Sequence, residues 1–179
     1  RQARSSASPA LQLRLAKNAG LRIPHTTFTN NLQDVLELAE KHKRIIVKPG
    51  PFLGMAMNEQ RILTQLIDPT TLRAEDLHSS PCLFQEYIEK ACELRAHIIG
   101  QTVLTCKIDS QRTETTKIDW RNYALADTPH TPIDISDELS KQCLEIIKNL
   151  GLSFGIMDLI VTPEGEIVFL ECNSQGHWL

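Results

Sequence analysis

The stretch from residue 154 to residue 173 constrains the fold more than any other part of the chain. It contains two apolar runs rich in Ile, Val, Leu and Phe, which a Pro-x-Gly turn at Pro163–Gly165 joins. Such runs around a turn of this kind predict a β-hairpin. The apolar runs are interrupted by three residues with oxygen ligands, Asp158, Glu171 and Asn173.

These three residues are expected to meet on one face of the hairpin. A turn centred on residues 164 and 165 places Asp158 roughly opposite Glu171, and the i, i+2 spacing puts Glu171 and Asn173 on the same face. Burying such charges without a counterion is costly, so the cluster predicts a bound cation. Mg²⁺ fits best, because it takes one or two carboxylates and completes its octahedron with water and phosphates. The alternative is that each is a polar residue at a strand end, pointing to solvent.

The same residues carry a resemblance to a known family. Phe-Gly-x-x-Asp at 154–158, the Pro-x-Gly turn, and Phe-Leu-Glu-x-Asn at 169–173 resemble the metal-binding hairpin of the ATP-grasp ligases. The resemblance implies ATP as cofactor and two Mg²⁺ ions, with Mn²⁺ as an alternative, held by Asp158, Glu171 and Asn173. The closing Gln-Gly-His-Trp at 175–178 is similar to the branch that modifies ribosomal peptides, the microviridin-type or graspetide ligases, which are RimK-like.

Composition excludes several classes of protein. The 179 residues carry a formal net charge of -3, which argues against a general nucleic-acid or membrane-surface binder. There is neither an apolar stretch of membrane-spanning length nor a signal peptide, so we expect a cytoplasmic protein. Five irregularly spaced cysteines are typical of core residues in a reducing compartment. Because no CxxC or HExxH motif occurs, we do not expect zinc.

Lys48 ends an apolar strand at a Pro-Gly break. A lysine in that place delivers a point charge to a phosphate, although an exposed lysine on the surface is the ordinary alternative. Val-Lys-Pro at 47–49 resembles the family position that contacts the ATP phosphates. The next loop, residues 51–57, departs from the family pattern because it has less glycine and a hydrophobic tip.

Gln85-Glu86-Tyr87-Ile88 ends a second apolar strand. Extended backbone beside a pocket offers N–H and C=O groups that suit the edge of adenine. The four residues resemble the adenine-binding segment of the ATP-grasp fold, which implies contacts from the Glu86 carbonyl and the Ile88 amide. Glu93 falls where the family places a ribose-binding acid. The alternative for this stretch is a plain edge strand.

Basic residues follow at three places. Residues 93–109 alternate around a Gly-Gln turn and predict a hairpin. Within it, Arg95 resembles the arginine of the family's Glu/Asp-x-Arg motif, and Lys107 occupies the basic position of the next strand. Asp-Trp-Arg at 119–121 resembles a stretch of the peptide-modifying branch and implies that Arg121 acts on phosphate oxygens. The alternative for Arg121 is an ion pair with Asp119.

The predicted fold class is α+β, with two subdomains of mostly antiparallel sheet backed by helices that clasp ATP. We expect a linker at residues 1–8, a first subdomain at 9–86 and a second at 87–179. Helices are predicted from Pro9 to before Gly20, from about residue 32 to His42, and from Ser136 to Gly151. Residues 124–131 are predicted to be irregular. Family members normally carry a preceding substrate-binding domain, which we expect to be absent from this sequence.

The resemblance implies an ATP-dependent carboxylate ligase. Arg95 and Arg121 are the implied catalytic residues, and Lys48, Gln85, Glu86, Tyr87, Ile88, Glu93 and Lys107 are the implied nucleotide-binding residues. The expected partner is a precursor peptide or another carboxylate substrate, with a homodimer left open and no nucleic acid or membrane. A RimK-like or small-molecule ligase is one alternative, and a non-catalytic module that binds nucleotide or peptide is another.

Overall fold

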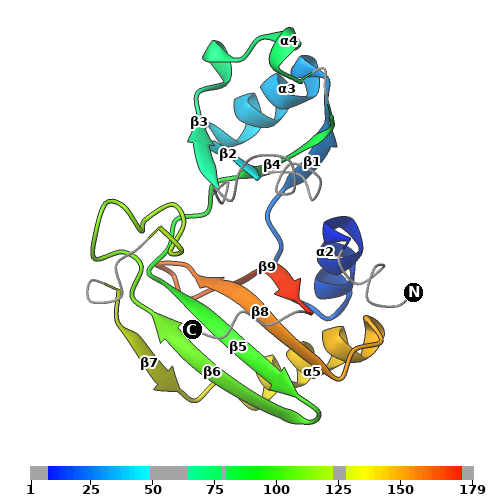
Figure 1. Cartoon of the computed structure of the whole chain (residues 1–179), viewed down its shortest axis with the longest axis vertical. Coiled ribbons are helices and arrows are strands. Elements are labelled where there is room, and N and C mark those ends of the chain that lie inside the picture. The colour runs from blue at the N-terminus through cyan, green and yellow to red at the C-terminus, as the bar shows by residue number, and fades with distance from the viewer. Residues whose placement is uncertain (1–7, 49–63, 78–79, 123–127, 175–179) are drawn as a thin grey trace, which may run out of the picture. The chain divides into compact units, whose positions relative to one another are not determined.

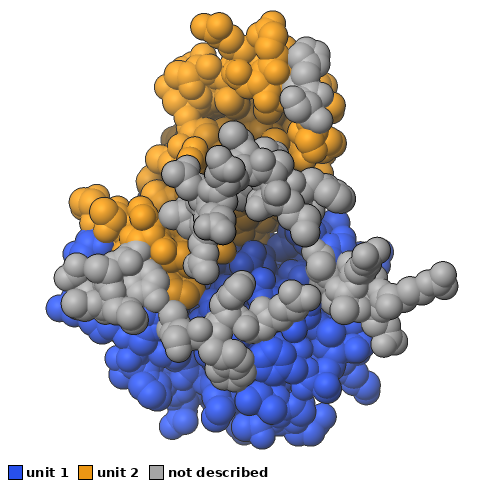
Figure 2. All heavy atoms as spheres, in the orientation of Figure 1, with its two compact units in different colours: residues 1–23, 89–113, 124–179 blue, residues 24–88, 114–123 orange. Residues whose placement is uncertain are grey.

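The chain forms two compact units. The computed structural model describes residues 8–48, 64–77, 80–122 and 128–174. Unit 1 comprises residues 1–23, 89–113 and 124–179, and unit 2 comprises residues 24–88 and 114–123. Figure 2 shows the two units in different colours. The chain passes between the units several times, so each unit is assembled from segments that are distant in the sequence.

Unit 1 is built on a five-stranded antiparallel sheet in the order β7-β6-β5-β8-β9 (Figure 1). Its strands are β5 (Cys92–Ile99), β6 (Thr102–Ile108), β7 (His130–Ile133), β8 (Phe154–Val161) and β9 (Ile167–Asn173). Helix α5 (Asp137–Asn149) packs against β5, β6 and β8, and helix α2 (Pro9–Asn18) packs against β9 and α5. Unit 1 therefore has one sheet face covered by helices.

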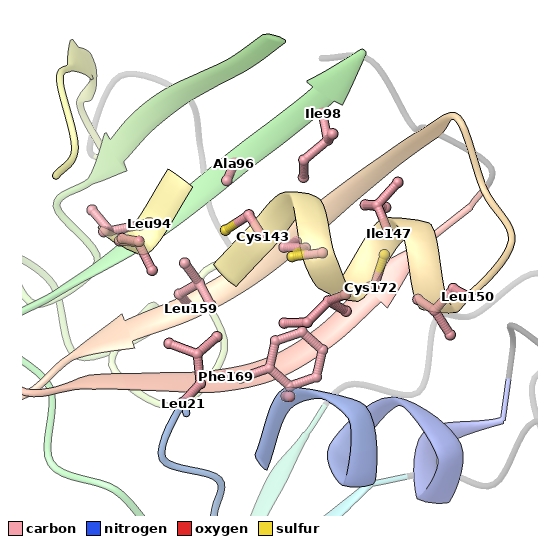
Figure 3. Close-up of a cluster of buried hydrophobic side chains, with 14 of the residues drawn as sticks. Leu21, Leu94, Ala96, Ile98, Cys143, Ile147, Leu150, Leu159, Phe169 and Cys172 are labelled. Carbon is pink, nitrogen blue, oxygen red and sulfur yellow. The ribbon is translucent and has the colours of Figure 1, made fainter. Parts of the chain in front are cut away.

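The core of unit 1 lies between this sheet face and the helices. Leu94, Ala96 and Ile98 alternate along β5 and point to the helices, where they meet Cys143 and Ile147 of α5 (Figure 3). All five cysteines of the chain are free thiols. Burial raises the pKa of Cys143 to about 11. The buried cysteines are therefore small core residues, as predicted.

Tight turns and a helix cap explain where the elements of unit 1 end. Gly100 has a φ of 60° in the β5–β6 turn and Gly165 a φ of 85° in the β8–β9 turn, a backbone region that glycine enters most easily. The side chain of Ser136 accepts a hydrogen bond from the Leu139 N–H at 3.2 Å and so caps α5. These are the hairpins and the helix that the sequence predicts.

Unit 2 contains a four-stranded antiparallel sheet in the order β1-β4-β2-β3. Its strands are β1 (Thr26–Thr29), β2 (Ile45–Lys48), β3 (Gln65–Ile67) and β4 (Cys82–Glu86). Helix α3 (Leu32–His42), which the Asn31 side chain caps, packs Val35 and Leu38 against Ile45 and Phe84. A short 3₁₀ turn (Pro69–Thr71) and α4 (Ala74–Leu77) also belong to this unit.

The sheets and helices confirm the predicted α+β class, but the structure divides the chain differently at two places. Helix α2 belongs to unit 1, because it packs on β9 and α5. Residues 114–123 belong to unit 2, although the prediction put them in the second subdomain. The predicted change at residues 86 and 87 lies close to the change of unit after Ile88.

The prediction of an irregular segment at 124–131 was partly wrong, because β7 begins at His130. Among the described strands, this short strand pairs with β6 alone, and its Pro132 is tolerated at the edge of a sheet. A polar four-residue strand that contains proline gives no periodic signal, which is why the sequence does not reveal it. Across the described residues, no helix combines the length and the apolar character needed to cross a membrane.

Candidate functional site

The three predicted metal ligands lie together on the β8–β9 hairpin. Asp158 faces Glu171 across the ladder, and Asn173 faces Ile156. The Asn173 carboxamide donates from Nδ2 to Glu171 Oε1 at 3.2 Å and to Asp158 Oδ2 at 3.4 Å. The predicted pairing of Asp158 with Glu171 is therefore correct, and the three oxygen-bearing side chains share one sheet face.

A β-bulge sets this register. The pairing shifts between Asp158 and Leu159, so that Leu170 is an extra residue on β9. Val168 and Phe169, before the bulge, are buried, whereas Glu171 after it is half-buried. The bulge allows Glu171 to share its face with Asp158, and nothing in the spacing of the sequence announces it.

Arg95 of β5 joins the cluster from the opposite side of β8. It is the ladder partner of Asp158, and its Nη1 lies 3.0 Å from Oδ1 and 3.4 Å from Oδ2 of that carboxylate. Both side chains are less than a tenth exposed. The structure thus brings a predicted catalytic arginine and the predicted metal ligands onto one face of three adjacent strands.

The residues of this cluster fit a hard cation. Two carboxylates and one carboxamide are the oxygen donors that Mg²⁺ prefers. In the structure, the Asn173 amide nitrogen and the Arg95 guanidinium face the carboxylates. A half-turn of the Asn173 carboxamide replaces its nitrogen by its oxygen, so that Asp158, Glu171 and Asn173 then present oxygen atoms alone.

A buried glutamine of α2 fixes the backbone between two of these ligands. Gln12 donates from Nε2 to the Cys172 carbonyl at 2.7 Å and accepts from the Cys172 N–H at 2.9 Å. Its side chain therefore pairs with β9 as another strand would, although Gln12 is only 5% exposed. Cys172 stands between Glu171 and Asn173, so Gln12 holds the backbone that carries both ligands. Sequence reasoning missed this residue.

Gln12→Met is expected to lower the free energy of unfolding by about 1–3 kcal/mol, because it leaves the buried N–H and C=O of Cys172 without their partner. Chemical denaturation measures the change, and amide hydrogen exchange at Cys172 should become faster. Gln33→Met, on the exposed side of α3, is the matched control and should change stability by less than about 0.5 kcal/mol. Equal losses in the two variants would contradict the role of Gln12.

Glu93 and Lys107 are the other predicted site residues of unit 1. Glu93 lies two residues before Arg95 on the same face, is 3% exposed, and pairs with Lys90 Nζ at 2.8 Å. Lys107 faces Leu94 in the ladder and so lies on the opposite sheet face from Arg95. Its Nζ is 4.0 Å from Asp109 Oδ1. The structure therefore brings Glu93, but not Lys107, to the face of the ligand cluster.

In unit 2, Lys48 and Gln85 share the sheet face that α3 leaves uncovered. Lys48 is the ladder partner of Leu83, and Gln85 is the partner of Ile46. Gln85 is 1% exposed and donates from Nε2 to Thr26 Oγ1 at 2.8 Å, but its Oε1 has no partner among the described residues. A buried acceptor without a donor is costly, so this atom fits a ligand that supplies an N–H.

The remaining predicted adenine-binding residues follow Gln85. Tyr87 donates its backbone N–H to the Arg44 carbonyl at 2.9 Å, and the Arg44 guanidinium lies 4.1 Å from the centre of the Tyr87 ring. Ile88 is buried. The Glu86 side chain lies on the α3 side of the sheet with His42, so it is away from the face of Lys48 and Gln85. Their backbone contacts with adenine stay a prediction.

Arg121 makes the ion pair with Asp119 that was the alternative for it. Its Nε is 2.8 Å from Oδ1 and its Nη2 is 2.7 Å from Oδ2, a two-pronged arrangement. The Thr64 N–H also donates to Oδ2 at 3.1 Å. Burial alone would raise the pKa of Asp119, but the hydrogen bonds and charge of Arg121 outweigh it and lower the pKa to about 2. An active-site role of Arg121 stays a prediction.

The pH dependence of stability should reveal this pair. Because the pKa of Asp119 falls from 3.8 to about 2 on folding, the pair contributes stability above pH 3.8 and loses it as the pH falls through about 2. The contribution at neutral pH is about 2 kcal/mol. We expect Asp119→Asn to be less stable than the wild type by that amount at pH 6, and the difference to shrink towards pH 2. Unfolding by urea at several pH values measures it; a constant difference would contradict the pairing.

No protein-family model matches the chain, and no curated protein matches it. Solved structures do. A ribosomal-peptide-associated ATP-grasp ligase of Chryseobacterium gregarium, in complex with ADP and a leader and core peptide, superposes with a TM-score of 0.90 and 31% identity over 98% of this chain. The macrocyclase MdnC of Microcystis aeruginosa, bound with precursor peptide MdnA, gives 0.84 and 33% over 99%. The chain has the fold of the ATP-grasp ligases.

The chain spans about half the length of these ATP-grasp ligases, with 54% and 55% of theirs covered. A third ATP-grasp ligase, PsnB, complexed with a phosphomimetic variant of its minimal precursor, Mg and ADP, gives a TM-score of 0.74 and 25% identity over 98% of this chain and 52% of its own. Together these structures confirm the resemblance of the chain to ATP-grasp ligases that modify ribosomal peptides.

The ATP-grasp residues predicted from the sequence are divided between the units. Unit 1 carries Glu93, Arg95, Lys107 and the three metal ligands, and unit 2 carries Lys48, Arg121 and residues 85–88. The loop at 51–57, which departs from the family pattern, and the closing segment at 175–178 lie outside the described residues.

Proposed function

We propose that this chain is the ATP-grasp part of a ligase that uses ATP and Mg²⁺ to couple a peptide side-chain carboxylate to a hydroxyl or an amine. The observation that carries the proposal is the arrangement of Asp158, Glu171 and Asn173 beside Arg95 on one sheet face. Three similar structures support the peptide substrate, because each is a ligase complexed with its own precursor or leader and core peptide.

In the proposed reaction, a substrate carboxylate oxygen attacks the γ-phosphorus of ATP, and ADP leaves with the bond's electrons. The amine or hydroxyl then attacks the acyl carbon, loses its proton, and displaces inorganic phosphate. Bound Mg²⁺ would supply positive charge to the phosphate oxygens. An ester or amide crosslink is the product, and the peptide loses one water for each bond.

In this proposal, the residues of the chain position ATP and the metal and neutralise the charge of the phosphates. Asp158, Glu171 and Asn173 hold the metal, and Arg95 fixes Asp158 through their buried ion pair. Lys48 meets a phosphate, and Gln85 Oε1, which has no partner among the described residues, accepts a hydrogen bond from the amino group of adenine. Such catalysis depends on positioning and charge rather than on a protein nucleophile.

The test is ADP release by the purified protein with Mg²⁺ and candidate precursor peptides. Peptide-dependent ADP release, with a mass loss of one water per coupling, supports the proposal. ADP release that needs a free amino acid or another small carboxylate instead favours a small-molecule ligase. Nucleotide binding without any carboxylate-dependent turnover favours a binding module, and absence of nucleotide binding overturns the proposal.

A further inference from the structure

Three side chains of unit 2 meet on the α3 side of its sheet, away from the face of Lys48 and Gln85. Glu86 is the last residue of β4, His42 is the last residue of α3, and His25 precedes β1. The Nδ1 of His42 is 3.0 Å from Glu86 Oε2, and the Nδ1 of His25 is 3.4 Å from Glu86 Oε1. The two imidazole rings lie 4.5 Å apart between their centres.

The backbone holds these residues close together. The Glu86 N–H donates to the His25 carbonyl at 3.0 Å, and the His25 N–H donates to Glu86 Oε1 at 2.9 Å. His42 is brought to the same point because α3 packs on β2 and β4. The fold of unit 2 therefore brings the backbones of the three residues to one place.

Two imidazoles and one carboxylate form a donor set for a transition metal. Each residue offers one ligand atom, and these atoms lie within 4.8 Å of one another. Around a tetrahedral zinc with bonds of about 2.1 Å, ligand atoms are about 3.4 Å apart. The two histidine–glutamate distances, one to each oxygen of Glu86, are near this value, so a small movement of the side chains brings the three ligand atoms to bonding distance of one ion. His25, whose side chain is 58% exposed, has room to rotate.

The environment of His42 favours a neutral ligand. Burial lowers the pKa of His42 against the opposing effect of the Glu86 charge, which favours the neutral imidazole that binds metals. Its Nε2 is buried without a partner among the described residues. The exposed side of His25 leaves room for water at a remaining coordination position.

We propose that His25, His42 and Glu86 bind one divalent transition-metal ion of the Zn²⁺ class. Imidazole nitrogen suits Zn²⁺, Cu²⁺ and Ni²⁺ better than Mg²⁺, whereas the oxygen cluster of unit 1 has the opposite preference. No short sequence motif such as CxxC or HExxH indicates this site, because its three ligands lie far apart in the sequence. This proposal is independent of the ligase proposal and is tested without turnover.

The experiment titrates chelator-treated protein with Zn²⁺ in competition with a chromophoric chelator. We expect one Zn²⁺ per chain, and His25→Gln, His42→Gln and Glu86→Gln should each weaken binding at least about tenfold, since loss of an outer-sphere partner alone costs that much. His25→Gln is the decisive variant, because its exposed side chain contributes little to the core. Circular dichroism verifies the fold of each variant.

Two matched controls separate this site from the rest of the chain. His130→Gln, a histidine of β7 in unit 1, and Glu171→Gln, at the oxygen cluster, should both keep the Zn²⁺ affinity of the wild type. Co²⁺ in place of Zn²⁺ should give the visible absorption of a four- or five-coordinate ion, lost in His25→Gln. No Zn²⁺ bound by the wild type, or equal affinities in the wild type, His25→Gln and Glu86→Gln, would overturn the proposal and leave a hydrogen-bonded cluster only.

Discussion

Glu171→Gln is expected to lower the rate of ATP-dependent ligation by about 100- to 1000-fold, because it removes one of the two carboxylates that hold the metal. The substitution keeps the size of the side chain and leaves the buried pair of Arg95 and Asp158 intact. Stability should therefore change little. Steady-state ADP release with saturating ATP and peptide measures the effect, and raising the Mg²⁺ concentration should recover part of the lost rate.

Glu164→Gln is the matched control for this prediction. Glu164 lies in the exposed turn of the same hairpin, between β8 and β9. It is therefore a glutamate of this hairpin that does not belong to the oxygen cluster. We expect its rate and its Mg²⁺ dependence to equal those of the wild type. Full activity in Glu171→Gln would contradict the assignment of the oxygen cluster as the metal site, whatever the identity of the substrate.

The ligand cluster could be predicted from the sequence because its information is local. A turn with a proline and a glycine fixes the hairpin, and two-residue alternation fixes the face, so Asp158, Glu171 and Asn173 follow from spacing. The bulge at Leu170 does not follow, because an extra residue in one strand changes no periodic signal that is visible beforehand. The bulge matters because it places Glu171, and not Leu170, opposite Asp158.

Residues whose role depends on another element could not be predicted. Lys107 was assigned from its place in a strand, but the pairing of β5 with β6 puts it on the face opposite to Arg95. A one-residue change in the register of β5 and β6 would move Lys107 to the face of Arg95. The sequence of either strand alone does not determine this register. Gln12 and His25 have the same limitation, because their partners lie in distant segments.

The buried pair of Arg95 and Asp158 should have a large effect on stability. Arg95→Met removes the guanidinium and leaves a carboxylate buried without its partner, which costs about 3–5 kcal/mol. For a chain of this size that loss corresponds to a fall of about 6–20 °C in Tm. Calorimetry and denaturation by urea measure the change. The exposed ion pair of Arg22 and Glu166 is the control, and Arg22→Met should cost less than about 1 kcal/mol.

The double variant Arg95→Met/Asp158→Leu decides why the pair exists. If the loss in Arg95→Met comes from an unpaired buried charge, replacing both partners by apolar side chains should recover most of the stability, because neither charge then has to be desolvated. We expect the double variant to be more stable than Arg95→Met by about 2 kcal/mol. It should nevertheless show no ligation, since Asp158 is a metal ligand in the proposed function. If the double variant loses as much free energy of unfolding as the two single variants together, the arginine stabilises unit 1 by packing. If the double variant still catalyses ligation, Asp158 is not a ligand of the metal site.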